Sequence, residues 1–137
     1  MTNQELFDIA LTNLRRQRVC SIVGDECRYR GENGARCAVG WAIPDEKYRR
    51  VFEGLDVGQL IDQNRLPEEL RGVNYQLAQE IQRAHDFYMP LGDDQPEPMN
   101  ATRRQIFKMK DGRGMEMWEA EMKEIAARFN LNYAEPA

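Results

Sequence analysis

The sequence predicts an α+β fold: a mainly helical single domain with a small antiparallel hairpin or a three-stranded sheet. Three stretches carry apolar residues at helical spacing. The first stretch is followed by a glycine-containing segment with short runs of residues that are typical of strands. The chain has 137 residues, 42% of them hydrophobic, which suits one domain with one core. We therefore expect residues 1–137 to fold as a single domain.

The first helix begins at the N-terminus. Thr2 and Glu5 form a T-x-x-E capping box, in which each side chain accepts from a backbone N–H that the first turn leaves unpaired. An apolar stripe follows at positions i, i+3, i+4 and i+7, namely Phe7, Ala10, Leu11 and Leu14. Arginines then suit the negative end of the helix dipole.

Residues 19–43 predict two or three short strands. Val19–Val23 is β-branched, and the runs 27–30 and 35–39 flank a turn at 31–34. Asn33-Gly34 favours a type I′ turn because both residues tolerate positive φ. A loop of two or four residues would place Cys27 and Cys37 on opposite faces, whereas an odd loop or a bulge would place them on the same face.

Further helices are predicted in the remaining chain. Residues 45–53 fit one short helix that Gly54 ends, and residues 57–61 fit another turn. A clean apolar stripe then predicts a helix from Pro67 to about Asp86, with His85 at the edge of its buried face. The last helix spans about Met115 to Phe129, and its methionine and tryptophan stripe is typical of a core.

Residues 89–100 hold three prolines and three acidic residues, which indicate an exposed loop, and residues 102–110 fit a strand. Charge is uneven along the chain: residues 51–100 contain ten acidic and three basic groups, and the flanking parts are near neutral. A basic cluster follows the loop (Arg103, Arg104, Lys108, Lys110 and Arg113), but it is sparse, so nucleic-acid binding stays a minor hypothesis.

Composition excludes several function classes. No apolar run approaches the roughly 18 residues of a membrane helix, and the N-terminus has acidic residues before its arginines, the reverse of a secretory signal. A net charge of −4 argues against a general nucleic-acid coat or a polybasic membrane binder. No Walker loop, dinucleotide fingerprint, G-x-S-x-G or H-E-x-x-H is present, and we expect no cofactor.

The densest group of candidate ligand-binding residues lies in the predicted hairpin. Arg28, Arg30 and Arg36 could hold a phosphate or carboxylate, and Tyr29 could stack on a base. With His85 as a further contact, they predict a site for a small anionic ligand such as a nucleotide. The alternative is a solvated hairpin whose arginines pair with the acidic middle of the chain.

The cysteines and the single histidine form a second candidate. By residue type alone, the chain offers four metal ligands, Cys20, Cys27, Cys37 and His85. Their spacing matches no zinc signature. The odd cysteine count does not suggest a disulfide framework. The alternative is that Cys20 and Cys37 pack in the core as small apolar residues.

A thiol nucleophile is a third candidate, because Cys37, His85 and a carboxylate would be the groups that such a site needs. Asp86 follows His85, but neighbours in a helix point about 100° apart, so we expect Asp86 to be poorly placed to orient the ring. The alternative is a histidine hydrogen-bonded at the rim of the core.

Several segments resemble a family of small proteins encoded by tailed phages and prophages. They are Cys27-Arg28-Tyr29-Arg30-Gly31, Arg36-Cys37-Ala38-Val39-Gly40, Ile43-Pro44-Asp45-Glu46 with Tyr48, Glu53-Gly54, and His85-Asp86. The similarity covers about residues 2–88. It divides the chain into a family-like body 1–88, the Pro-rich loop 89–100 and a C-terminal extension 101–137.

The resemblance implies a viral accessory protein acting in the cytoplasm of a bacterial host, without naming a mechanism. We expect a non-enzymatic binding protein that counters host defence by sequestering a nucleotide signal or by blocking a host defence protein. The alternative is a Cys/His metal-binding or thiol-dependent protein. A third possibility is a homo-oligomer whose C-terminal methionine and tryptophan helix is the interface.

Overall fold

The computed structural model describes residues 1–24, 26–92 and 113–137. Over these residues the chain is mainly helical, with one two-stranded antiparallel sheet, which confirms the predicted fold class. The helices are α1 (Asn3–Gln17), α2 (Ala38–Ala42), α3 (Val57–Asp62), α4 (Tyr75–Tyr88) and α6 (Gly114–Arg128), and the strands are β1 (Ile22–Val23) and β2 (Glu26–Cys27).

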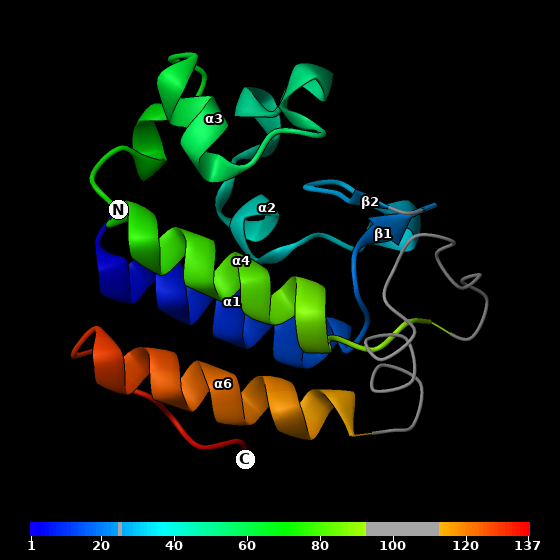
Figure 1. Ribbon diagram of the computed structural model, residues 1–137, viewed down its shortest axis with the longest axis vertical. Coiled ribbons are helices and arrows are strands. Elements are labelled where there is room, and N and C mark those ends of the chain that lie inside the picture. Colours follow the sequence, from blue (N-terminus) through cyan, green and yellow to red (C-terminus); the bar gives the residue numbers. More distant parts are fainter. Residues whose placement is uncertain (25, 93–112) are drawn as a thin grey trace.

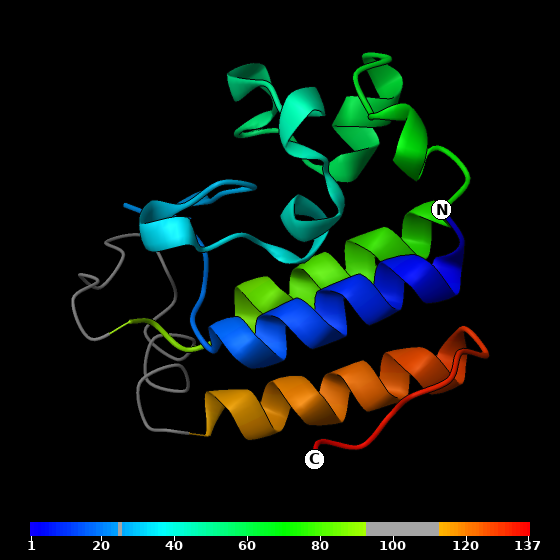
Figure 2. The same ribbon diagram turned by 180° about the vertical axis from the view of Figure 1, so that it is seen from behind.

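The three long helices lie side by side, with α1 and α4 adjacent and α6 packed along them (Figures 1 and 2). The short helix α2 packs on both α1 and α4, and α3 packs on α4. The hairpin of β1 and β2 lies at one end of this group, near the C-terminal end of α1. The hairpin is therefore positioned beside the last turn of α4, which carries His85.

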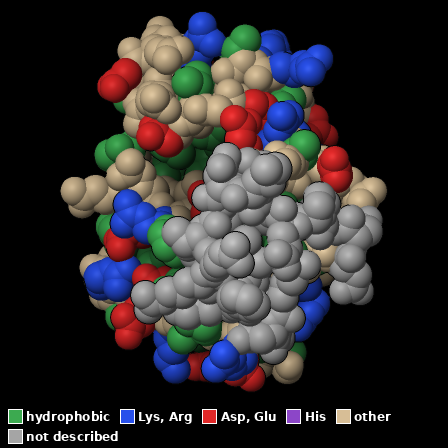
Figure 3. Space-filling view, turned by 45° about the vertical axis from the view of Figure 1, so that its right-hand side comes forward, with side chains coloured by type: hydrophobic (Ala, Val, Ile, Leu, Met, Phe, Trp, Pro, Cys, Tyr) green, Lys and Arg blue, Asp and Glu red, His purple; other side chains and the backbone are tan. Residues whose placement is uncertain are grey.

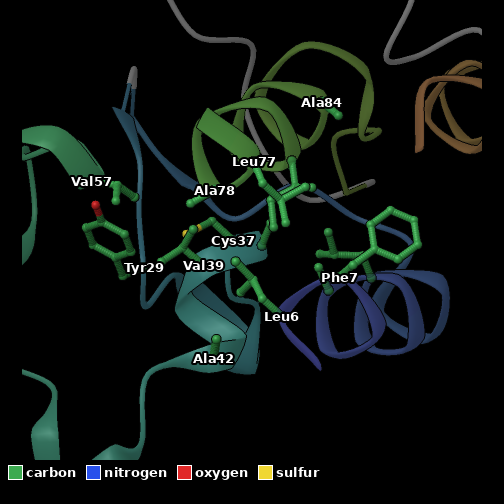
Figure 4. Close-up of a cluster of buried hydrophobic side chains, with 14 of the residues drawn as sticks. Leu6, Phe7, Tyr29, Cys37, Val39, Ala42, Val57, Leu77, Ala78 and Ala84 are labelled. Atoms are coloured by element: carbon green, nitrogen blue, oxygen red, sulfur yellow. The ribbon is translucent and has the colours of Figure 1, made fainter. Parts of the chain in front are cut away.

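The core forms where the predicted apolar stripes meet. Leu6 and Phe7 of α1, Val39 of α2 and Leu77 of α4 are all at most 1% exposed, and Figure 4 shows these elements meeting in one cluster. The stripe of α6 closes the other side of the core, with Trp118 fully buried. Trp118 and Met122 of this stripe therefore pack within the chain, whereas Met115 and Met117 are half-buried.

Helix boundaries follow their capping residues. The Thr2–Glu5 capping box is present, and α3 and α6 match their predicted positions. The helix predicted from Pro67 is wrong in its first part, because Asn74 caps α4 by accepting from two N–H groups of its first turn, and a 3₁₀ turn at Glu68–Leu70 precedes it. Residues 45–53 are likewise two 3₁₀ turns, Asp45–Lys47 and Arg50–Phe52, and not one helix.

The hairpin lies earlier in the chain than predicted. Ile22 pairs with Cys27 and Val23 with Glu26, whereas Ala38–Ala42 is helical rather than a strand. Asn33 and Gly34 do adopt the positive φ angles that their sequence suggests, 56° and 79°. Their turn belongs to a 3₁₀ segment and joins no strands, so the local signal was right and the pairing inferred from it was wrong.

Most of the Pro-rich loop, the strand predicted at 102–110 and the basic residues Arg103, Arg104, Lys108 and Lys110 lie outside the described residues. Among the helices that the structure does describe, none has the length and apolarity needed to cross a bilayer.

Candidate functional site

Three segments that the sequence analysis singled out, residues 27–31, 43–48 and 53–54, hold one another in place. The Glu53 carboxylate accepts from the backbone N–H groups of Tyr29 (2.9 Å) and Arg30 (3.1 Å), and from the Tyr48 hydroxyl (2.6 Å). Tyr29 in turn donates its hydroxyl to the carbonyl of Leu55 (2.6 Å). Glu53 therefore ties these three segments together, a role that sequence spacing alone did not reveal.

The arginines expected to bind an anion have partners within the chain. The Arg30 guanidinium donates to the carbonyls of Gly40 (2.6 Å) and Ile43 (2.9 Å), which satisfies the end of α2. Asp45 forms ion pairs with both Arg30 (3.1 Å) and Arg36 (3.0 Å). These two arginines thus neutralise a carboxylate of this chain, but Asp45 precedes the acidic middle, residues 51–100, with which the alternative interpretation paired them.

The predicted ligand-binding residues do not form an open site, as the surroundings of Tyr29, Arg36 and Arg28 show. Tyr29 is 5% exposed, with its ring beside Val57 in Figure 4, so its faces pack in the core. Arg36 lies over the Trp41 ring at 4.8 Å. Arg28 Nε is buried without a hydrogen-bond partner among the described residues. Outside the grey residues, Figure 3 shows basic and acidic side chains interspersed on its face.

Three of the four predicted metal ligands come together. The ligand atoms of Cys20, Cys27 and His85 all lie within 4.8 Å of one another. The hairpin produces the first contact, because the Arg28 N–H donates to the Ser21 carbonyl (2.9 Å) and continues the pairing of Ile22 with Cys27. Cys20 and Cys27 are then diagonal neighbours across the two chain segments.

His85 joins this group from the last turn of α4 and is fully buried. The Ser21 N–H donates to His85 Nε2 at 3.0 Å, so Nε2 is unprotonated in this arrangement. The proton therefore sits on Nδ1, which donates to Asp86 Oδ1 at 2.7 Å. The expectation that Asp86 is poorly placed to orient the ring is wrong, because its side chain turns back to reach the imidazole.

The electrostatics of the group follow from these contacts. The thiol of Cys27 donates to the sulfur of Cys20, which lowers the pKa of Cys20 and raises that of Cys27. Burial lowers the pKa of His85, but the Cys20 sulfur and Asp86 raise it, and the net shift is upward. Negative charge is thus favoured on Cys20, the sulfur farther from solvent.

Cys37 does not join this group. It is fully buried, and its sulfur accepts from the Gly40 N–H (3.3 Å) at the start of α2. Burial raises the pKa of this thiol, which opposes formation of the nucleophilic thiolate. The packing role expected of Cys37 is therefore the one that its surroundings favour.

A cleft of about 340 Å³ opens onto the cysteine and histidine group. Cys27 and Asp86 line it, together with the carboxylates Glu26 and Asp56, and among the residues that the structure describes no lysine or arginine lines it. Its field is therefore negative, so it attracts cations and repels anions.

Comparison of the chain with known protein families, with characterised proteins and with solved structures finds no match to any of them. A function is therefore inferred from the geometry of Cys20, Cys27, His85 and Asp86.

Proposed function

We propose that this protein binds a soft divalent cation, with Zn²⁺ as the representative, through Cys20, Cys27 and His85. The observation that carries the proposal is the approach of their ligand atoms to within 4.8 Å of one another. Two thiolates and one imidazole are donors that zinc prefers, and three protein ligands leave a fourth position open. We refer to these three residues with Asp86 as the cation site.

Asp86 supports this chemistry without being a required ligand. Histidines that bind metals commonly donate their second ring N–H to a carboxylate, which fixes the tautomer and strengthens the free nitrogen as a donor. The Asp86 contact to Nδ1 is of this kind. Nε2 is the nitrogen that carries no proton, and a cation bound there displaces the hydrogen bond from the Ser21 N–H. We therefore propose an exchangeable site, since each binding event must replace a hydrogen bond.

The charge of the cleft favours a cation over the anionic nucleotide expected from the sequence. Glu26, Asp56 and Asp86 line the route to Cys27. Binding also converts two thiols into thiolates, whose two negative charges compensate those of the cation. We further propose that the protein is a phage accessory protein that binds its cation in the cytoplasm of a bacterial host.

A cobalt titration tests the proposal. Metal-free protein is titrated with Co²⁺, and we expect one equivalent to produce thiolate-to-cobalt charge-transfer absorption that Zn²⁺ then displaces. Cys20→Ser and Cys27→Ser should each weaken binding, by roughly tenfold or more. Cys37→Ser is the matched control, because serine retains an acceptor for the Gly40 N–H, and it should bind as the wild type does.

The proposal fails if the wild type binds Co²⁺ no more tightly than the Cys20→Ser, Cys27→Ser double variant. Circular dichroism and thermal unfolding of each variant show whether it is folded, so that loss of binding is not confused with loss of structure.

A further inference from the structure

We propose that Cys20 and Cys27 are a modification site, at which hydrogen peroxide forms a reversible disulfide between the two sulfurs. The sulfurs lie within 4.8 Å of each other and share a hydrogen bond. This inference goes beyond cation binding and does not require it, because it concerns the metal-free protein.

The chain between the two cysteines allows the sulfurs to approach further. Cys20 precedes β1, and its N–H donates to the Pro90 carbonyl (2.7 Å). Cys27 is the last residue of β2. A disulfide requires the sulfurs to move to about 2.0 Å, and rotation of two cysteine side chains with a small shift of a strand end can supply this movement.

Access decides which sulfur reacts first. Cys20 is fully buried, whereas Cys27 is half-buried and lines the cleft. The cleft carboxylates repel anionic oxidants such as glutathione disulfide, but they do not exclude a small neutral oxidant. Hydrogen peroxide is therefore the class of oxidant that the cleft admits to Cys27.

The reaction balances in two steps. Cys27 Sγ transfers its proton through their hydrogen bond to the Cys20 sulfur and attacks one peroxide oxygen; the O–O bond breaks, and the departing hydroxide takes up the proton that Cys20 had released, as water. Cys27 is left as a sulfenic acid. Cys20 Sγ then attacks Cys27 Sγ; the S–S bond forms, the S–O bond breaks, and hydroxide leaves with the Cys20 proton as a second water. Two thiols and one peroxide give one disulfide and two waters.

The disulfide would remove two of the three donors of the cation site. Oxidation should then abolish cation binding, and bound cation should protect the thiols. This consequence rests on the proposed function, whereas the disulfide itself does not.

The sequence provides a direct readout. Trypsin cleaves after Arg18, Arg28 and Arg36, so Cys20 and Cys27 fall in one peptide, 19–28, and Cys37 falls in another, 37–47. Protein kept metal-free with a chelator is treated with stoichiometric peroxide, alkylated, digested and weighed. We expect peptide 19–28 to be unalkylated and two hydrogen atoms lighter, peptide 37–47 to be fully alkylated, and dithiothreitol to reverse the change.

Two variants separate the sulfurs. In Cys20→Ser, Cys27 should stop at the sulfenic acid, which dimedone traps, and Cys37→Ser should form the disulfide as the wild type does. Full alkylation of peptide 19–28 in folded, peroxide-treated protein would overturn the inference. So would a crosslink to peptide 37–47, or sulfinic acid at Cys27 while the Cys20 thiol stays reduced. Because no metal is present, failure here is distinguishable from failure of cation binding.

Discussion

The Nδ1 atom of His85 lies 2.7 Å from the carboxylate of Asp86, the next residue of the same helix. The contact fixes the proton on Nδ1 and leaves Nε2 as an acceptor for the Ser21 N–H at 3.0 Å. Asp86 is thus a positioning residue for the ring, and through it for the cation site.

Removing this carboxylate should weaken cation binding without abolishing it. We expect Asp86→Ala to lower the Zn²⁺ affinity by roughly tenfold to a hundredfold, since the ring loses the partner that sets its tautomer. Asp86→Asn retains an acceptor for Nδ1 and should recover part of the loss. Competition with a chromophoric chelator measures each affinity. Asp62→Asn, at an exposed position of α3, is the control, and an Asp86→Ala affinity within twofold of the wild type would contradict the assigned role.

Substitution of Glu53 should lower the free energy of unfolding more than substitution of most other polar residues. Both of its oxygens accept hydrogen bonds, from Tyr29, Arg30 and Tyr48, and an amide presents a donor where one of these oxygens now accepts. We expect Glu53→Gln to lower the free energy of unfolding by about 2–4 kcal/mol. Urea denaturation measures the change, with the exposed Glu46→Gln as control, expected within about 0.5 kcal/mol of the wild type. Equal stabilities of the two variants would contradict the central role of Glu53.

Gly40 and Gly72 provide a matched pair. A Cβ on Gly40 would overlap the backbone carbonyl of Tyr29, whereas one on Gly72 would meet only the Met1 carbonyl at 3.5 Å. We expect Gly40→Ala to destabilise the protein by about 3 kcal/mol or more, because the backbone itself must move. Gly72→Ala should be neutral or slightly stabilising. Thermal unfolding compares the two, and a Gly40→Ala variant as stable as Gly72→Ala would show that α2 does not pack against Tyr29 this closely.

The elements that the sequence predicted well are those set by periodic patterns. Stripes such as Phe7 to Leu14 fix a buried helix face regardless of what covers it, so α1, α6 and the second part of the helix predicted from Pro67, which is α4, were confirmed. The hairpin was misplaced because the φ angles of Asn33 and Gly34 are local properties, whereas strand pairing depends on residues elsewhere in the chain.

The sequence indicated which residue types form the candidate site, but not which of these residues come together in the fold. Counting cysteines and histidines indicated four ligands, and only the fold shows that Cys20 and Cys27 join His85 while Cys37 caps α2. The error about Asp86 has a different cause. The 100° step between helix neighbours describes where side chains leave the backbone, and a carboxylate can still rotate back to reach an adjacent ring.

Nucleotides should not stabilise the protein. Arg30 and Arg36 already pair with Asp45, and Tyr29 is buried, so binding phosphate and base would require breaking these contacts. A nucleotide bound with micromolar affinity would raise the melting temperature by about 10 °C at millimolar concentration. Differential scanning fluorimetry with linear and cyclic nucleotides should show no such shift. A shift of this size that Arg36→Ala removes would favour the nucleotide hypothesis over the cation site.

The Arg15–Glu119 pair should give the fold an acid-sensitive contact between α1 and α6. Arg15 contacts both carboxylate oxygens (2.5 and 3.0 Å), and the Tyr133 hydroxyl donates to one of them (2.6 Å). Burial raises the pKa of Glu119, but these donors lower it more, so its pKa lies below the ordinary 4.5. Stability from a lowered carboxyl pKa is present above 4.5 and is lost as the pH falls through the folded-state pKa.

We therefore expect Glu119→Gln to cost about 1–2 kcal/mol at neutral pH, since both partners are mostly shielded from solvent. The difference from the wild type should shrink as the pH falls below 4.5, because protonation then removes the same charge from the wild-type protein. Urea denaturation across this range measures it. Glu135→Gln, whose partner Lys123 is 63% exposed, should change stability little at any pH. A Glu119→Gln deficit that stays constant into strong acid would mean that the contact stabilises the protein by packing and not by charge.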